Sequence, residues 1–224
     1  MNNELKIVFP IAAVVVIALG AVAYFAIRSA PSTPVVVLAT PSTTLTDAGK
    51  ISRPDQRSRG ATNAKVTVVE FGDFQCPACQ TAEPIVQELV QKYKDKSVSF
   101  AFRNFPLDQH ANAQSSATAA EAAGAQGKYW EMHDMLYSKH DEWAETTSAV
   151  AENHFIDYAK QVGVKDADKF KAALDNHSYN EILGRDLADA GGLQLQGTPS
   201  FFVDEKPVSA VTGVAAAIDA ALAK

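Results

Sequence analysis

The sequence predicts an α/β domain that is interrupted by a block of helices and preceded by a long apolar segment. A strand, a helix and a second strand follow one another after residue 64, which is the order that builds a parallel sheet. A helical block and then a hairpin with a last helix complete the chain. One core is expected, because 224 residues, 47% of them hydrophobic, suffice for one well-buried domain with appendages.

The charge balance is mildly acidic, with 20 Lys and Arg residues against 26 Asp and Glu residues. The sequence contains no basic stripe and no arginine cluster interleaved with aromatic residues, which nucleic-acid-binding proteins need. Nucleic acid is therefore not an expected partner.

The segment Ile7–Ile27 contains 21 residues without a charge. A helix of this length crosses a hydrocarbon core of about 30 Å, so residues 1–28 are predicted to anchor the chain in a membrane. The alternative is a cleaved secretory signal, whose apolar region is typically about 7 to 15 residues long. Both interpretations place the rest of the chain outside the cytoplasm, where a disulfide can persist.

Residues 29–63 are rich in Pro, Ser and Thr and have no sustained apolar period. They are predicted to form a tether to a folded domain at residues 64–224. In that domain "KVTVVEFGDF" suits a buried strand that stops directly before the cysteines. Apolar residues at helical spacing then predict a helix from about Cys76 to Lys94, and "SVSFAFRNFPL" alternates like a second strand.

A helical insertion is expected at about residues 108–192, from five stretches with helical composition and spacing. Among them is an apolar stripe that is expected to be core rather than a peptide groove, formed by Tyr129, Trp130, Met132, Met135 and Leu136. After the insertion, "TPSFFVD" and "KPVSAVTG" predict a hairpin. A helix with Val214, Ile218 and Leu222 on one face follows.

The chain has only two cysteines, Cys76 and Cys79, with Pro77 and Ala78 between them. A metal site needs about four ligands, but there is no second C-x-x-C and no suitably spaced histidine pair. No metal is therefore expected. A purely structural disulfide across a two-residue gap would remove little entropy from the unfolded chain. Neither interpretation explains the pair well.

A redox function is favoured by the position of the pair at the start of a helix. Partial positive charge and free N–H donors at that place favour a thiolate, so Cys76 is the candidate nucleophile. Cys79 lies one turn later on the same helix, close enough to attack a mixed disulfide on Cys76. The redox interpretation is favoured over the structural and metal interpretations.

The motifs "VEFGDFQCPACQ" and "GTPSFFVD", together with the helical insertion between them, resemble the DsbA-like branch of the thioredoxin superfamily of thiol:disulfide oxidoreductases. The resemblance covers about residues 64–224 and implies a thioredoxin fold. It implies that Thr198 precedes a cis Pro199 beside the cysteines and binds substrate peptides. It also implies that Glu70 is a buried acid that accepts the proton of Cys79; a solvent-facing glutamate is the alternative.

The same resemblance implies an extracytoplasmic enzyme, periplasmic or at the cell surface, that introduces disulfides into exported proteins. It needs no cofactor beyond the Cys76–Cys79 disulfide. A membrane partner of the DsbB or vitamin K epoxide reductase type would reoxidise it. Ala78 departs from the histidine of the most oxidising members, so a reductase or isomerase stays an alternative. A non-catalytic, membrane-tethered peptide-binding protein is the other alternative.

Overall fold

The computed structural model describes residues 48–224. The segment Ile7–Ile27, expected to be a membrane anchor, lies outside the described residues, as does most of the expected tether. Of the helices between residues 48 and 224, none has both the length and the apolar character that a membrane crossing needs. The anchor therefore stays a prediction from the sequence.

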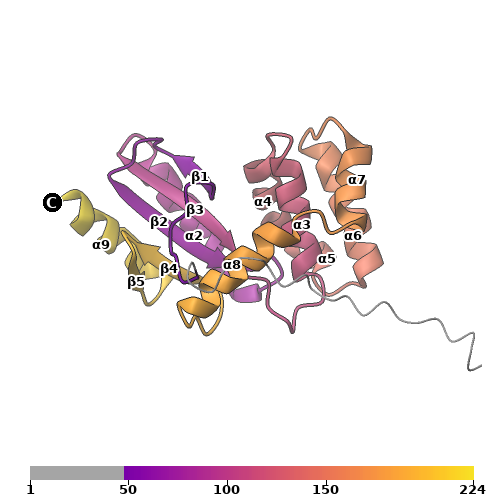
Figure 1. Ribbon diagram of the computed structural model, residues 1–224. Coiled ribbons are helices and arrows are strands. Elements are labelled where there is room, and N and C mark those ends of the chain that lie inside the picture. Colours follow the sequence, from indigo (N-terminus) through magenta and orange to yellow (C-terminus); the bar gives the residue numbers. More distant parts are fainter. Residues whose placement is uncertain (1–47) are drawn as a thin grey trace, which may run out of the picture. The chain divides into compact units, whose positions relative to one another are not determined.

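A mixed five-stranded sheet forms one side of the described residues, and helices α3 to α7 gather on the other side (Figure 1). Its strands, in spatial order, are β1 (Arg57–Gly60), β3 (Val98–Asn104), β2 (Val66–Gly72), β4 (Ser200–Val203) and β5 (Lys206–Val208). β2 and β3 are parallel, and all other neighbours are antiparallel. The expected parallel pair and the expected hairpin of β4 and β5 are confirmed.

Helices connect the strands and form the insertion. They are α2 (Pro77–Tyr93), α3 (Ala113–Gly124), α4 (Tyr129–Ser138), α5 (His140–Trp143), α6 (Ser148–Gln161), α7 (Ala167–Asp175), α8 (Asn180–Gly192) and α9 (Val211–Leu222). α2 joins β2 to β3, which confirms the strand, helix, strand unit. The six helices α3 to α8 lie between β3 and β4 in the chain, so the helical insertion is confirmed.

Both faces of the sheet are covered. On one face Val68 of β2 belongs to a cluster with Ile218 of α9 and apolar residues of α2. On the other face Val69 belongs to a cluster with Ala190 of α8. Successive side chains of a strand point to opposite faces. A strand buried on both sides therefore reads as a continuous apolar run, which is why "VTVVEF" was recognisable.

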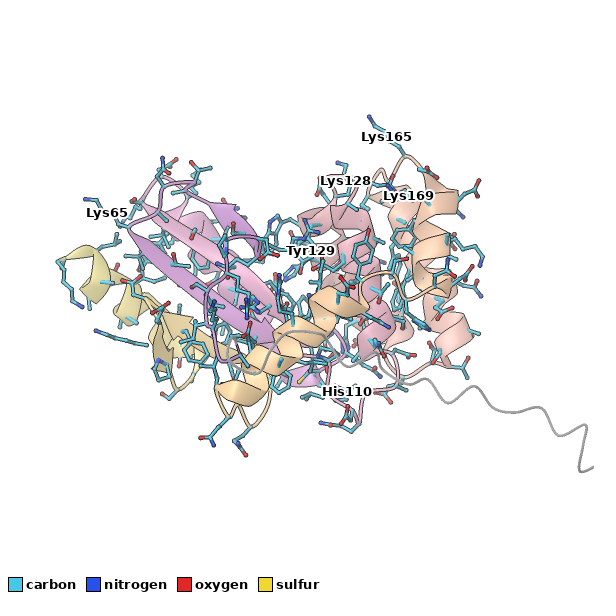
Figure 2. All side chains as sticks on the ribbon, viewed as in Figure 1. Lys65, His110, Lys128, Tyr129, Lys165 and Lys169 are labelled. Atoms are coloured by element: carbon cyan, nitrogen blue, oxygen red, sulfur yellow. The ribbon has the colours of Figure 1, made fainter. Side chains whose placement is uncertain are left out.

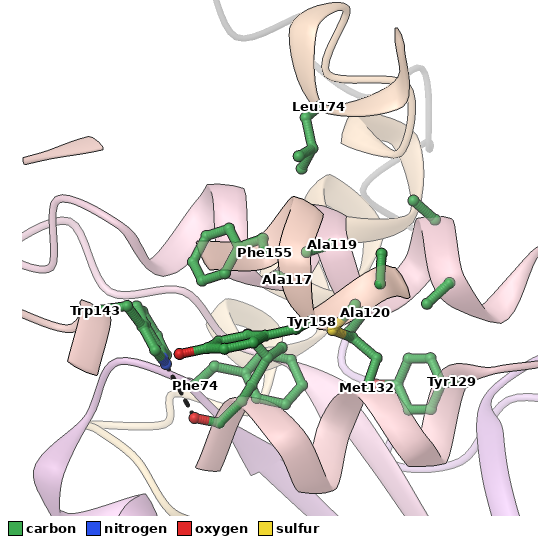
Figure 3. Close-up of a cluster of buried hydrophobic side chains, with 14 of the residues drawn as sticks. Phe74, Ala117, Ala119, Ala120, Tyr129, Met132, Trp143, Phe155, Tyr158 and Leu174 are labelled. Carbon is green, nitrogen blue, oxygen red and sulfur yellow. Dashed lines mark hydrogen bonds between the residues drawn. The ribbon is translucent and has the colours of Figure 1, made fainter. Parts of the chain in front are cut away.

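The insertion has its own core, in which aromatic side chains from several helices meet alanines of α3 (Figure 3). Trp143 is fully buried, and its indole N–H donates to the carbonyl oxygen of Leu136 at 3.0 Å, which Figure 3 draws as a dashed line. Tyr129, Met132 and Leu136 are buried in this core, and Trp130 and Met135 pack against it. The expectation that this apolar stripe is core is confirmed.

The structure corrects the C-terminal part of the expected tether, because Arg57–Gly60 form β1 on the edge of the sheet. Upstream of β1, the Arg53 guanidinium binds Asp189 of α8 at 2.5 Å. Asp189 also lies 2.6 Å from Arg103 of β3, whose side chain is fully buried. The folded domain therefore begins before residue 57. The sequence "RSRG" hid the strand, since a short edge strand with two arginines shows no apolar period.

Candidate active site

Cys76 lies where the chain passes from β2 to α2. β2 ends at Gly72, and Cys76 is the N-cap of α2 with an extended backbone (φ −70°, ψ 122°). Pro77 takes the first helical position, where its fixed φ suits the helix and its missing N–H costs no hydrogen bond. The N–H of Cys76 donates to the carbonyl oxygen of Asp73 at 3.1 Å, which closes the turn. The predicted place of the first cysteine is confirmed.

The sulfur of Cys76 is the activated thiol. A hydrogen bond from the Cys79 thiol lowers the pKa of Cys76 from 9.0 to about 5, although burial acts in the opposite direction. The backbone N–H groups of Ala78 and Cys79 lower this pKa further, because free N–H donors at a helix N-terminus favour an anion. The side chain of Ala78 adds neither charge nor a donor. At neutral pH Cys76 is therefore a thiolate.

Cys79 has the opposite properties, although it lies on the same helix. It is 1% exposed, whereas Cys76 is 7% exposed, and both are free thiols in this structure. Burial raises the pKa of Cys79 well above 9.0, and the neighbouring Cys76 and the Glu70 carboxylate raise it further. The pair therefore joins a thiolate to a buried, protonated thiol, which is the arrangement that thiol exchange requires.

Glu70 is buried on β2, in register with Phe102 of β3. Burial raises the pKa of Glu70 well above 4.5; the Glu83 carboxylate adds to this effect and Arg59 opposes it. The charge of Glu70 in turn raises the pKa of Cys79, so the two groups influence each other's protonation. The alternative of a solvent-facing glutamate is wrong, and the function of Glu70 in proton transfer stays a prediction.

A small cavity of about 20 Å³ adjoins Glu70 and is also lined by Arg59, Trp130 and His133. This volume suits one water molecule. Within the described residues, the Nε atom of Arg59 is buried and has no hydrogen-bond partner. Most of its lining is apolar, so a water molecule there would have to bind to the polar groups of Glu70, Arg59 and His133.

Thr198 and Pro199 lie beside Cys76, although 122 residues separate Thr198 from it in the chain. The Thr198–Pro199 peptide bond is cis, as the resemblance implied. The Sγ atom of Cys76 lies 3.6 Å from the Thr198 carbonyl oxygen, to which the protonated thiol donates. The Thr198 side chain is one of the groups that lower the pKa of Cys76. The fold therefore joins the two sequence motifs at one place.

The structure also brings residues to the site that the sequence analysis left without a function. The carboxylate of Asp73 accepts hydrogen bonds from the N–H groups of Gln75 at 2.8 Å and Leu107 at 3.0 Å, and it lies 2.6 Å from Nδ1 of His110. His110 projects from the loop between β3 and α3 (Figure 2). The ring of His140 lies 2.8 Å from the Gln75 carbonyl oxygen. No sequence signal links these distant positions.

One cluster in residues 48–224 has the side-chain types of a metal site, formed by Glu83, His133 and Asp134, whose ligand atoms lie within 4.8 Å of one another. Its oxygens already have partners. Arg59 lies 3.1 Å from Asp134, and the amide of Gln87 donates to both carboxylates, at 2.5 and 2.8 Å. A metal ion would displace these donors, so the cluster is better described as an ion-pair and hydrogen-bond network.

Comparison with known proteins identifies the family of this chain. The family model described as thioredoxin matches residues 52–220. Oxidised BdbD from Bacillus subtilis superposes with a TM-score of 0.71 at 25% identity, over 79% of this chain and 98% of that one. A thioredoxin-like oxidoreductase from Silicibacter pomeroyi superposes with a TM-score of 0.63 at 28% identity, over 77% of this chain and 95% of that one. The chain belongs to the thioredoxin family.

Within that family the chain is DsbA-like, because its superposition on these two oxidoreductases extends over nearly the whole of each of them. A curated relative, the Na(+)/H(+) antiporter NhaA 3 of Salinispora tropica, is 40% identical over 147 residues. That match covers 65% of this chain, and the chain spans only 21% of the length of that relative. The match therefore concerns one part of a much longer protein.

Proposed function

We propose that this chain introduces disulfides into exported proteins by exchange through the pair in Cys76-Pro77-Ala78-Cys79. The observation that carries the proposal is the asymmetry of the two thiols. The pKa of Cys76 is lowered to about 5, whereas burial raises that of Cys79 well above 9.0. A stabilised thiolate favours the reduced form of the pair, which makes the disulfide form an oxidant.

The reaction starts from the disulfide of Cys76 and Cys79. A substrate thiolate attacks Sγ of Cys76, a mixed disulfide forms, and Cys79 leaves as a thiolate. A second substrate thiolate then attacks the substrate sulfur of this mixed disulfide and displaces Cys76, again as a thiolate. The substrate loses two electrons and gains a disulfide, and the enzyme takes up the two electrons as a dithiol.

Glu70 supplies the proton that Cys79 needs as it leaves. The pKa of Cys79 is raised well above 9.0, so its thiolate must be protonated to persist in this buried place. The carboxyl of Glu70 also has a raised pKa, which makes it a suitable proton donor in this direction and a proton acceptor in reverse. The small cavity beside Glu70 supports the idea that one water molecule restores its proton.

Substrate peptides bind next to Cys76 by pairing with the backbone of Thr198 as an added strand. The closeness of the Thr198 carbonyl to Sγ of Cys76 supports this, since a peptide bound there would carry its cysteine to the nucleophile. Pro199 stands between Thr198 and β4, where a strand-like peptide would continue the backbone pattern.

The enzyme works outside the cytoplasm, in the periplasm or at the cell surface, and is tethered to the membrane by Ile7–Ile27. The uncharged run of that segment supports this, together with the likeness to the DsbA-like branch. A membrane protein of the DsbB or vitamin K epoxide reductase type takes the two electrons from the reduced pair. No bound cofactor is needed, because the cysteines themselves change oxidation state.

The experiment that tests the proposal measures how fast the protein exchanges disulfides with a substrate and whether the substrate is oxidised or reduced. Purified protein with an oxidised pair is mixed with a reduced, unfolded protein substrate, and disulfide formation is followed together with the equilibrium against glutathione. We expect stoichiometric oxidation of the substrate and a reduction potential above that of the glutathione pool. A potential below that pool would assign the chain to the reductases. No exchange at all, with Cys76 unreactive at mildly acidic pH, would favour the non-catalytic peptide-binding alternative.

A further inference from the structure

Gln75, the residue before the nucleophile, is buried and is hydrogen-bonded through all of its polar groups. Its backbone N–H donates to Asp73 at 2.8 Å, and its backbone carbonyl lies 2.8 Å from Nε2 of His140. Its side-chain amide donates to the carbonyl oxygen of Ala144 and accepts from the N–H of Asn112, both at 2.6 Å. Because a carbonyl oxygen only accepts, Nε2 of His140 carries a hydrogen atom.

Three of these four partners belong to the helical insertion rather than to the sheet. His140 is the first residue of α5, Ala144 follows the last residue of α5, and Asn112 is the N-cap of α3. The partners are also tied to one another, because the buried amide of Asn112 donates to the carbonyl oxygens of Trp143, Ala144 and Thr146 at 3.4, 3.3 and 3.0 Å. The insertion therefore surrounds this glutamine with partners that are hydrogen-bonded to one another.

We propose that Gln75 and His140 are positioning residues through which the helical insertion sets the orientation of the Cys76 sulfur. The inference rests on the proposed function, in which Cys76 is the nucleophile. The peptide bond between Gln75 and Cys76 contains the carbonyl that His140 holds, so a rotation of this peptide turns the N-cap itself. Hydrogen bonds weaken steeply as their angle changes. The thiolate therefore depends on this peptide for its alignment with the first N–H groups of α2.

This arrangement joins the nucleophile to both parts of the domain. The sheet holds Cys76 through β2, and the insertion holds it through Gln75, so a shift of α5 relative to the sheet reaches the sulfur directly. Asp73 supports the same turn, since its carboxylate accepts from the N–H of Gln75 and its backbone carbonyl accepts from the N–H of Cys76.

The test uses full-length protein in which one link at a time is removed. Gln75→Met keeps the length of the side chain and removes its amide, and His140→Phe keeps a planar ring and removes the donor. Gln80→Met is the matched control, because the Gln80 amide also joins α2 to the residues of α5, but at the surface, through Asp141 at 3.1 Å. His140→Gln restores a donor near the Gln75 carbonyl.

The measurements are the ultraviolet absorbance of the Cys76 thiolate against pH and the alkylation rate of Cys76 below neutral pH, with circular dichroism as a check on folding. We expect alkylation to slow by about three- to tenfold in Gln75→Met and His140→Phe, since the thiolate fraction follows the alignment of its donors. Alkylation should stay unchanged in Gln80→Met and recover in His140→Gln.

Unchanged thiolate titration and alkylation in folded Gln75→Met, with only a lowered melting temperature, would overturn the inference and leave Gln75 as a stabilising residue. If Gln75→Met does not fold, the two His140 variants decide between the outcomes. Equal alkylation rates of Cys76 in His140→Phe and in the wild-type protein would contradict the proposal. These outcomes are distinct from failure of the proposed function, in which Cys76 of the unchanged chain would itself show no thiolate and no exchange.

Discussion

Lowering the pH through 5 should change the slope of the reduction potential against pH. Above this value Cys76 is a thiolate while Cys79 keeps its proton, because their pKa values are about 5 and well above 9.0. Reduction of the disulfide by two electrons then takes up one proton. Below pH 5 it takes up two. For a two-electron couple these cases give slopes of about 30 and about 59 mV per pH unit.

The same difference in pKa acts on folding stability. In the folded, reduced protein the pKa of Cys76 is lowered from 9.0 to about 5. The stabilisation of the reduced form is therefore fully present above pH 9.0 and is lost as the pH falls through about 5. The disulfide form has no such group. Unfolding by urea should accordingly show that the stability of the reduced form relative to the disulfide form rises as the pH increases from about 5.

The assay equilibrates the protein with glutathione buffers between about pH 4 and 8 and measures the reduced fraction by alkylation and mass. Glu70→Gln serves as the control. Glu70 has a raised pKa, so a change in its protonation on reduction would add to the slope of the potential against pH, and glutamine cannot take up a proton. A constant slope of about 59 mV per pH unit over the whole range would refute the reasoning, since it would mean that Cys76 stays protonated.

Three further outcomes are expected. Cys76→Ser should abolish exchange, whereas Cys79→Ser should accumulate mixed disulfides, seen as mass shifts; trapping through Cys79 in the Cys76→Ser protein would contradict the assignment. Asp189→Asn should destabilise the domain by about 1.5 to 3 kcal/mol in urea unfolding, because the buried Arg103 keeps only the Asp186 carboxylate, at 2.7 Å; a loss below about 0.5 kcal/mol would show that the pair with Asp189 contributes little. Full-length protein should stay with membranes after alkaline washing if Ile7–Ile27 is an uncleaved anchor, and a mature N-terminus beyond this segment would show a cleaved signal instead.

Strands β2 to β5 and the reactive pair were predictable because each has a local signal. β2 is a continuous apolar run, and Cys76 follows it at the start of a helix with Pro77 in the first position, where proline is favoured. The helical insertion was predictable from composition and spacing. The same signals predicted that the apolar stripe between Tyr129 and Leu136 packs in the core. In each case the residues that make the structure are neighbours in the chain.

The remaining features depend on partners that are distant in the chain. β1 exists because it pairs with β3, and nothing within Arg57–Gly60 itself indicates a strand. The bond between His140 and Gln75 spans 65 residues, and a lone histidine in a sequence is usually without function. The burial of Glu70 was available only through the resemblance, since a single acid within a strand reads equally well as a solvent-facing residue.

The edge strand β5 affects how long an unfolded polypeptide stays bound to the sheet. A sheet edge with free N–H and carbonyl groups is a template on which unfolded chains can pair and remain. β5 has only three residues; Lys206 places a charge there, and Pro207 lacks an N–H to offer. This edge therefore gives an incoming polypeptide few bonds beyond those next to Cys76. The proposed exchange with unfolded proteins needs such a boundary, because turnover requires that each substrate chain dissociate once its sulfur has been exchanged.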